Sequence, residues 1–205
     1  MKASIQPAKS CFRSQQQDSD AYFLCLLLDP VPAPLSKHQT SSSAILLGMT
    51  VHADYEHDVQ AVYQALTTPG FLVDRSQALG ELCAECDVEA SEEFTTISMV
   101  REVGRVLPGV LARLFDPVHV MDMTEKWQPD GEGWRGDWTM TVRGQPVTIL
   151  GNFKLVPTNG GCRYSVSHQA RVKISFVGSQ VQKFILGQTI KGANDELEYL
   201  RDYLG

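Results

Sequence analysis

The sequence has no apolar run long enough to cross a membrane, which takes about twenty residues. Its longest run covers residues 21–28. That run is also a poor signal peptide, because Asp18 and Asp20 precede it where a signal peptide carries basic residues. We therefore expect no integral membrane insertion, and the cytoplasm is the default location.

Basic residues are outnumbered as well. The chain carries 18 lysines and arginines against 24 aspartates and glutamates, which gives a formal net charge of -6 at pH 7. A chain of this charge has no electrostatic attraction for a phosphate backbone or for anionic lipid. We therefore expect no nucleic-acid partner.

Cysteine is scarce, and the common cofactor motifs are missing. Five cysteines, an odd number, do not make a disulfide scaffold and fit a reducing compartment. Cys83 and Cys86 have the C-x-x-C spacing, but a zinc site needs two further ligands with their own spacing, so we interpret both as structural. No P-loop, Rossmann glycine pattern, nucleophile elbow or H-E-x-x-H motif occurs. The sequence thus points to no metal and no cofactor.

The first 48 residues differ in composition from the rest. They contain a glutamine run, a proline-alanine run and a serine run, with no sustained helical or strand period. Such a segment buries too little apolar surface to offset the entropy of ordering. We expect residues 1–48 to be disordered, or to be an extension upstream of a natural start at Met49. Residues 49–205 then form the folded domain.

The pattern of residues 49–205 predicts an α+β fold. After a first strand come two short helices, the first capped by Asp58 and the second ending at Gly80. Alternating apolar and polar residues then predict about six antiparallel strands. A final helix carries an apolar stripe. The predicted strands cover residues 50–55, 82–89, 94–100, 118–127, 134–142, 147–155 and 163–174, and the predicted helices cover 59–66, 71–79 and 176–204.

Four short stretches add a resemblance to a known superfamily. They are the Leu-Pro-Gly run at 107–109, Trp127 before an Asp-Gly turn, Gly151 in mid-strand and residues 172–178 before the last helix. With the order of elements, they resemble the START-like (SRPBCC, polyketide cyclase-like) helix-grip superfamily, and within it the uncharacterised bacterial family DUF2505. The resemblance covers about residues 50–204. It implies a curved antiparallel sheet of six to seven strands around a long C-terminal helix, with a hydrophobic cavity between them, but no reaction or catalytic residue.

His168 is the most informative polar residue of the predicted sheet. Alternation places it on the inward face with Val166 and Ala170. Near pH 7 a buried imidazole can donate or accept a hydrogen bond or act as a base. Glu125, on the inward face of its own strand, is a possible partner. The alternatives are a core histidine bonded to a backbone carbonyl and a register break that turns the side chain outward.

Aromatic, small and helical residues complete the candidate site. The tryptophans could form the wall of a pocket for an aromatic or acyl ligand, or they could fill the core. Gly187 and Gly192 in the last helix, like the strand glycine, leave room for a ligand or for close helix–sheet contact, which we favour. The candidate ligand-binding residues are Glu125, Trp127, Trp138, Gly151, His168, Val181, Ile185 and Gln188.

Arginines flank the apolar loop at residues 107–109. They are Arg101, Arg105 and Arg113. A loop of this kind could close over the mouth of a cavity, with the arginines meeting a carboxylate or phosphate. Ordinary solvated charges are the alternative.

Three functions remain open at this point. The first is a non-catalytic module that binds a small hydrophobic molecule such as a lipid, a polyketide or another aromatic. The second is an enzyme of the cyclase, aromatase or dehydratase kind with His168 as acid–base. The third is an interaction module that presents an acidic strand, with Glu85, Asp87 and Glu89, to a basic partner. Few polar groups converge on the predicted pocket, which favours binding over catalysis.

Overall fold

A seven-stranded antiparallel sheet and a long C-terminal helix make up most of the described chain. The computed structural model describes residues 48–104, 116–173 and 178–205. The predictions for residues 1–47, for the loop at 105–115 and for residues 174–177 lie outside the described residues. The strands are β1 (Met49–Tyr55), β2 (Cys83–Ala90), β3 (Thr95–Gly104), β4 (Val118–Asp130), β5 (Gly133–Val142), β6 (Val147–Thr158) and β7 (Gly161–Val172).

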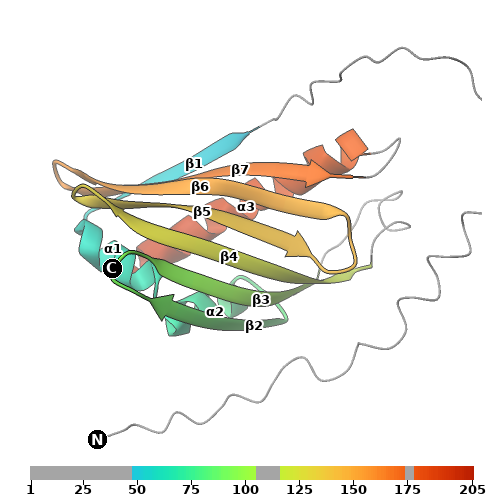
Figure 1. Cartoon of the computed structure of the whole chain (residues 1–205), viewed down its shortest axis with the longest axis horizontal. Helices are drawn as coiled ribbons and strands as arrows, with labels where there is room; N and C mark the ends of the chain where they lie inside the picture. The colour runs from blue at the N-terminus through green and yellow to red at the C-terminus, as the bar shows by residue number, and fades with distance from the viewer. Residues whose placement is uncertain (1–47, 105–115, 174–177) are drawn as a thin grey trace, which may run out of the picture. The chain divides into compact units, whose positions relative to one another are not determined.

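The strands are arranged in a single order with β1 at one edge and β2 at the other. Across the sheet they follow β1-β7-β6-β5-β4-β3-β2, so only the β1–β7 pair joins strands that are distant in sequence. Helix α3 (Gly178–Leu204) runs along one face of this curved sheet (Figure 1). The α+β helix-grip architecture predicted from the sequence is therefore confirmed.

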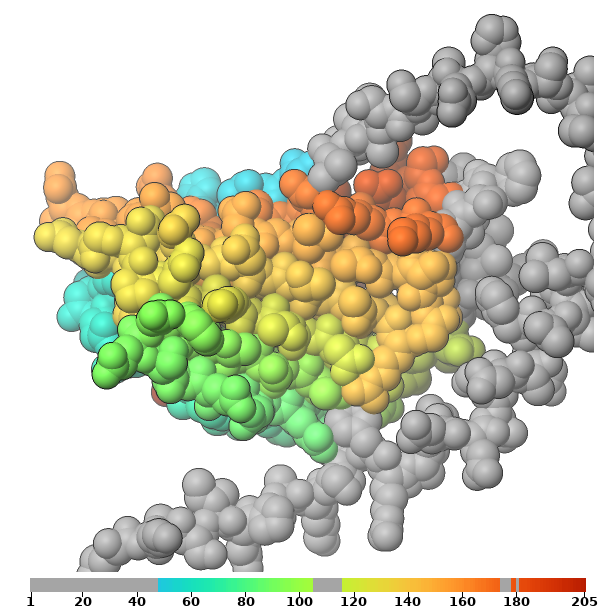
Figure 2. Space-filling view, in the orientation of Figure 1, coloured from blue at the N-terminus to red at the C-terminus, as the bar shows by residue number. Residues whose placement is uncertain are grey.

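Alternation along the strands decides which face is buried. In β5, Trp138 and Met140 are buried whereas Thr139 and Thr141 are exposed. The exposed side chains form the outer face, where the strands from β2 (green) to β7 (orange) make a continuous surface (Figure 2). The inner face carries the apolar side chains and is the face that α3 covers.

Three hairpins extend further than the sequence predicts. Strand β3 continues to Gly104, which pairs with Val118, and β4 continues to Asp130, which pairs with Gly133. The predicted ends at residues 100 and 127 are therefore too early. In the third hairpin, β6 continues past residue 155 to Thr158, which pairs with Gly161 at the start of β7. These extra residues are held by backbone pairing with the neighbouring strand, which an alternation pattern does not reveal.

Local signals place the two short helices. Helix α1 (Val59–Leu66) begins after Asp58, whose carboxylate accepts a hydrogen bond of 2.7 Å from the backbone N–H of Ala61. Helix α2 (Pro69–Ala78) begins two residues before its predicted start because Pro69 suits a first helical position. The chain leaves α2 through Gly80, which has the positive φ of 84° that favours glycine. Within the described residues, no helix is both long enough and apolar enough to cross a membrane.

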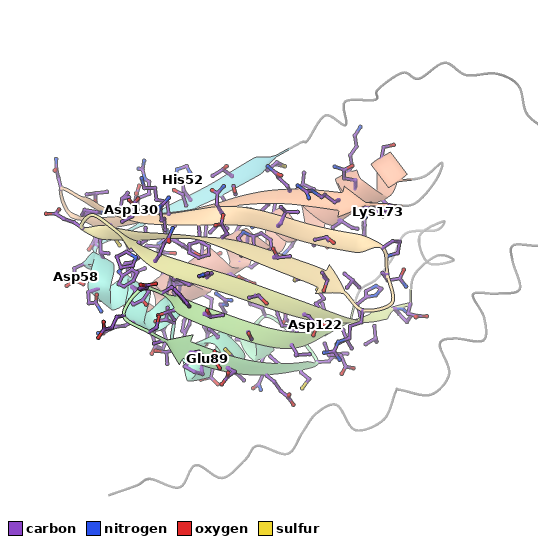
Figure 3. The ribbon with its side chains drawn as sticks, in the orientation of Figure 1. His52, Asp58, Glu89, Asp122, Asp130 and Lys173 are labelled. Atoms are coloured by element: carbon purple, nitrogen blue, oxygen red, sulfur yellow. The ribbon has the colours of Figure 1, made fainter. Side chains whose placement is uncertain are left out.

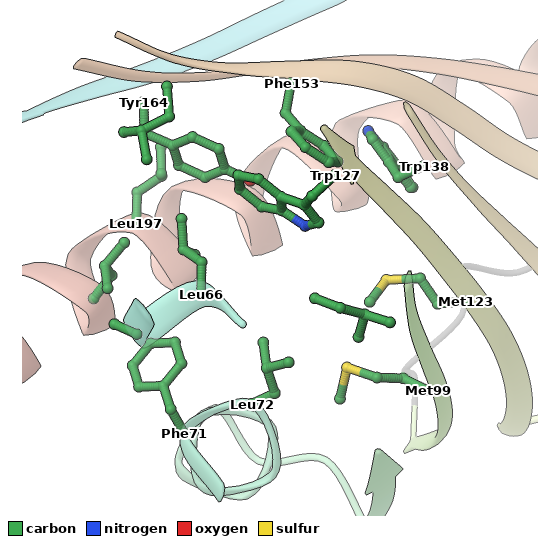
Figure 4. Packing of buried hydrophobic residues seen from close by; sticks show 14 of the residues in the cluster. Leu66, Phe71, Leu72, Met99, Met123, Trp127, Trp138, Phe153, Tyr164 and Leu197 are labelled. Atoms are coloured by element: carbon green, nitrogen blue, oxygen red, sulfur yellow. The ribbon is translucent and has the colours of Figure 1, made fainter. Parts of the chain in front are cut away.

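An aromatic core joins the sheet to α1, and a buried hydrogen bond joins the sheet to α3. Trp127 is fully buried, and its ring lies against that of Phe153, with the centroids 4.0 Å apart (Figure 4). The ring centroid of Tyr63, on α1, is 5.6 Å from that of Trp127. From β1, the hydroxyl of Tyr55 donates a hydrogen bond of 3.0 Å to the backbone carbonyl of Leu197. A buried hydrogen bond therefore ties the C-terminal part of α3 to β1.

Candidate ligand-binding cavity

A cavity of about 170 Å³ lies between the inner face of the sheet and α3. Side chains of β3 to β7 and of all three helices line it, and most of them are apolar. The lining from α3 includes Val181, Ile185 and Gln188, which the sequence placed in the candidate site. The space that the helix-grip resemblance implied beneath the long helix is therefore present.

The two helix glycines do not support close helix–sheet packing. A Cβ added at Gly187 or at Gly192 would meet no heavy atom within 4 Å. Our favoured interpretation, a close contact with the sheet, is therefore wrong for both. Gly192 lies in the wall of the cavity, whereas Gly187 is exposed and outside that wall. Only Gly192 leaves space at the cavity.

Six of the eight candidate residues line the cavity, and two do not. The six are Glu125, Trp138, His168, Val181, Ile185 and Gln188. Trp127 belongs to the aromatic core, and its indole Nε1 donates a hydrogen bond of 2.8 Å to the Glu125 carboxylate. Trp127 therefore positions a wall residue and is not part of the wall. Gly151 does not line the cavity either.

Gly151 is the place where β7 bends over β6. The Ser167 side chain replaces regular pairing here, accepting a hydrogen bond of 2.9 Å from the Asn152 N–H and donating one of 3.2 Å to the Asn152 carbonyl. The Ser167 carbonyl in turn accepts a hydrogen bond of 3.1 Å from the indole of Trp138. A Cβ on Gly151 would lie 1.8 Å from that carbonyl oxygen and 2.8 Å from the indole nitrogen. The glycine is required by this close approach and not by a ligand.

His168 stays on the inner face although the strand ladder is interrupted beside it. It is 3 % exposed, so the alternative of an outward side chain is wrong. Its ring meets Trp138 edge to face with centroids 5.2 Å apart. Among the described residues, its Nδ1 has no hydrogen-bond partner. Burial lowers the pKa of the imidazole, and the negative charge of Glu196 opposes that shift only in part. Backbone hydrogen bonds at Met49 and Val166 oppose it as well, which agrees with the alternative of a core histidine bonded to the backbone.

The predicted pairing of His168 with Glu125 is not formed within the described residues. Glu125 accepts its hydrogen bond from Trp127. The carboxylate whose charge acts on His168 is Glu196 of α3. The alternation pattern of the strand correctly predicted that Glu125 faces inward. It could not show which carboxylate lies near the imidazole, because Glu196 is on the helix α3.

A buried ionic cluster forms part of the wall, and the sequence analysis missed it. The Glu196 carboxylate lies 3.3 Å from Nη2 of Arg75 and 2.9 Å from Nη2 of Arg101. Arg101 also forms a two-pronged contact with Glu81, with its Nε 3.0 and 2.9 Å from the two carboxylate oxygens. Arg101 was expected to flank a lid loop as a solvated or ligand-binding charge; it is instead committed to this cluster.

The signal for this cluster lies in charged residues at apolar positions. Arg75 follows Phe71 by one helical turn and is as buried as that phenylalanine. Arg101 continues the inward row of Ile97 and Met99 on β3. Glu196 precedes the buried Leu200 by one turn of α3. A charge on an inward face requires a partner, so these three positions could have been flagged together.

Glu125 is the one wall carboxyl that we find without a cationic hydrogen-bond partner among the described residues. Desolvation raises its pKa, and the hydrogen bond from Trp127 offsets the rise only partly. The proton is therefore bound more tightly in the folded state than in the unfolded state. The stability that this group contributes is present at low pH and is lost as the pH rises through the folded pKa.

We expect Glu125→Gln to raise the free energy of unfolding at pH 7 and to change it little near pH 4. Glutamine keeps an acceptor for the Trp127 indole and removes the buried charge. Urea unfolding at both pH values measures the difference. Glu93→Gln, on an exposed turn, is the matched control and should change stability by no more than about 0.5 kcal/mol at either pH. A less stable Glu125→Gln variant at pH 7 contradicts the expectation.

The remaining predicted features are the cysteine pair and the acidic strand. Within the described residues, no group of three or more metal-binding side chains comes together. In the C-x-x-C pair, Cys83 is buried and Cys86 is a half-buried free thiol on the same strand, β2. The acidic side chains of β2 are exposed at the sheet edge, where Figure 3 labels Glu89. A basic partner for that edge stays a prediction.

Comparison with other proteins agrees with this architecture. A family described as "Protein of unknown function (DUF2505)" matches residues 50–204. No curated protein is significantly similar in sequence. An uncharacterized protein from Rhizobium leguminosarum has a similar structure, with 14% identity over 77% of this chain and 93% of that chain and a TM-score of 0.52.

Two further solved structures share the fold at equally low identity. A protein from Thermus thermophilus is 12% identical over 76% of this chain and 94% of that chain, with a TM-score of 0.52. The di-domain ARO/CYC StfQ from the steffimycin biosynthetic pathway is 12% identical over 77% of this chain and 50% of that chain, with a TM-score of 0.55. Similarity at this level concerns the fold alone. From the family match and the fold together, the chain belongs to the DUF2505 family and has a START-like helix-grip structure.

Proposed function

We propose that this protein binds a small hydrophobic molecule in the cavity between its sheet and α3. The observation that carries the proposal is the cavity itself, which has about 170 Å³ of space and a mainly apolar wall with a few polar groups. Small-molecule sites have this composition. An apolar cavity of ~150 Å³ is large enough for benzene. The volume therefore favours the smallest of the ligands considered from the sequence, a single aromatic ring or a short acyl chain.

Filling the cavity from α3 tests the proposal. Toluene is the probe, and its binding is measured from the shifts of backbone amide NMR signals in the full chain. Gly192→Leu directs an aliphatic side chain into open space at the wall. We expect it to weaken toluene binding by roughly tenfold or more without loss of stability, since glycine is a poor helix residue.

Gly187→Leu is the matched control on the same helix. Its Cβ also has open space around it, but the residue is exposed and outside the cavity wall. It should gain about 0.5–1 kcal/mol of stability from helix propensity and leave toluene binding unchanged. The proposal is contradicted if toluene does not bind the parent chain, or if the two leucine variants weaken binding equally.

Acid–base catalysis by His168 is a second candidate. It is favoured by one observation, a buried imidazole with a lowered pKa and an unpartnered Nδ1 at the cavity. A neutral imidazole near pH 7 can take a proton from a bound ligand. The likeness to the ARO/CYC protein is of fold only and adds no substrate. The test is His168→Gln, with toluene binding and any turnover found for the parent chain as the two measurements. Normal binding with loss of turnover supports the catalytic role, and full turnover in the variant excludes it.

A further inference from the structure

Two buried nitrogen atoms in the cavity wall lack hydrogen-bond partners among the described residues. They are Nε of Arg75, a residue that is 5 % exposed, and Nδ1 of His168, which is 3 % exposed. A buried polar group without a partner costs about 1–3 kcal/mol. An arginine Nε–H can only donate, so Arg75 requires an acceptor atom. Arg75 and His168 both line the cavity, so a ligand bound there is a source of such an acceptor.

The charges around Arg75 restrict what that acceptor can be. Two cations, Arg75 and Arg101, are matched by two anions, Glu81 and Glu196, through the ion pairs already described. The cluster is therefore neutral without a ligand. A ligand carboxylate would add an unbalanced negative charge beside Glu196 and close to Glu125, in a site where charge is poorly screened. An uncharged oxygen satisfies the Arg75 N–H without that cost.

The size of the cavity restricts the rest of the ligand. About 170 Å³ of space suits a single ring or a short chain and is too small for a sterol or a two-chain lipid. The wall beyond the cluster is aromatic and aliphatic, with Trp138, Phe153 and Ile149 from neighbouring strands. The apolar part of the ligand is expected against these residues, with its oxygen directed at α2.

We infer, on the premise that the proposed function is correct, that the ligand is an uncharged one-ring or short-chain molecule whose carbonyl or hydroxyl oxygen accepts a hydrogen bond from Arg75 Nε. The binding site is thus selective for neutral oxygen compounds such as phenols and ketones over acids of the same size. Arg75 acts as the residue that orients the ligand, and the ion pairs with Glu196 hold its guanidinium in place.

Three one-ring probes test the inference: toluene, p-cresol and p-toluate. Dissociation constants are measured with the full chain by NMR titration. We expect p-cresol to bind about tenfold more tightly than toluene, as one added hydrogen bond to a charged donor allows. We expect p-toluate to bind more weakly than p-cresol. Binding of toluene tests the proposed function, and the order of the three dissociation constants tests the inference. A failure of one is therefore distinguishable from a failure of the other.

Variants of α2 assign the selectivity to Arg75. Arg75→Lys keeps a cation for Glu196 and removes the Nε donor, so the ratio of the toluene to the p-cresol dissociation constant should fall to about one. Arg75→Met is the second variant and should behave in the same way. Ser76→Ala is the control, because Ser76 is the next residue, fully buried and outside the cavity wall. It should leave all three dissociation constants unchanged.

Three results overturn the inference while leaving the proposed function intact. They are equal binding of toluene and p-cresol, tightest binding of p-toluate, and an unchanged preference for p-cresol in both Arg75 variants. If none of the three probes binds the parent chain, the proposed function fails and the inference fails with it.

Discussion

Glu196→Gln is expected to lower the free energy of unfolding at pH 7 by about 3–5 kcal/mol, the usual cost of breaking a buried ion pair by removing one partner. Glu196 is the only residue described as bridging both buried guanidiniums, with contacts to Arg75 and Arg101. An amide can accept from one of them, but its NH₂ group then faces the other, donor against donor. Urea unfolding of the full chain measures the loss.

The pH dependence of this variant gives the loss a second signature. The guanidiniums of Arg75 and Arg101 hold the pKa of the Glu196 carboxyl below its usual value in spite of desolvation. The stability it contributes is therefore present above the unfolded pKa and is lost as the pH falls through the folded pKa. The gap between parent and Glu196→Gln should narrow in acid, whereas Glu125→Gln should change stability in the opposite direction at pH 7.

Glu198→Gln is the matched control for Glu196→Gln. It removes the same charge from the same helix two residues away, at an exposed position. It should change stability by no more than about 0.5 kcal/mol. A Glu196→Gln variant that is equally mild would show that the two arginines do not depend on this carboxylate, and the cluster would then lose its role in positioning Arg75.

Much of the fold is predictable because its signals are local. The Asp58 cap, the Gly80 helix stop and the alternation along β7 each depend on neighbouring residues in the sequence. The same alternation placed Glu125 and His168 on the inner face, and both line the cavity. Helical periodicity likewise placed the α3 wall residues. These inferences require only the period of a strand or a helix.

What the sequence did not predict depends on contacts between distant elements. Arg75, Arg101 and Glu196 lie on α2, β3 and α3, and each reads as an isolated inward charge until the fold brings them together. The predicted pairing of His168 with Glu125 was wrong for the same reason, because the carboxylate that acts on His168 is on a distant element, α3. Gly151 was predicted to leave room for a ligand or a helix, because nothing in the sequence shows that a neighbouring strand passes over it.

Gly151→Ala is therefore expected to destabilise the protein by about 3–5 kcal/mol, although alanine is ordinarily the better residue in a strand. The added Cβ would lie 1.8 Å from the backbone oxygen of Ser167 and 2.7 Å from its carbonyl carbon. A backbone carbonyl cannot rotate away as a flexible side chain can. Relief requires β7 to move from β6, which breaks the Ser167 contacts to Asn152 and Trp138.

Two comparisons separate this mechanism from a general sensitivity of the sheet. Gly104→Ala, at the end of β3, would meet only Leu82 Cδ1 at 3.8 Å and should change stability by about 0.5 kcal/mol or less. Trp138→Phe combined with Gly151→Ala should not restore stability, because the nearest obstacle is backbone and not the indole. If the double variant is as stable as the parent chain, the obstacle to the Cβ is the Trp138 indole, and the backbone of β7 is able to move. Since His168 directly follows Ser167, a displaced β7 should also shift the imidazole and weaken toluene binding in the Gly151 variant.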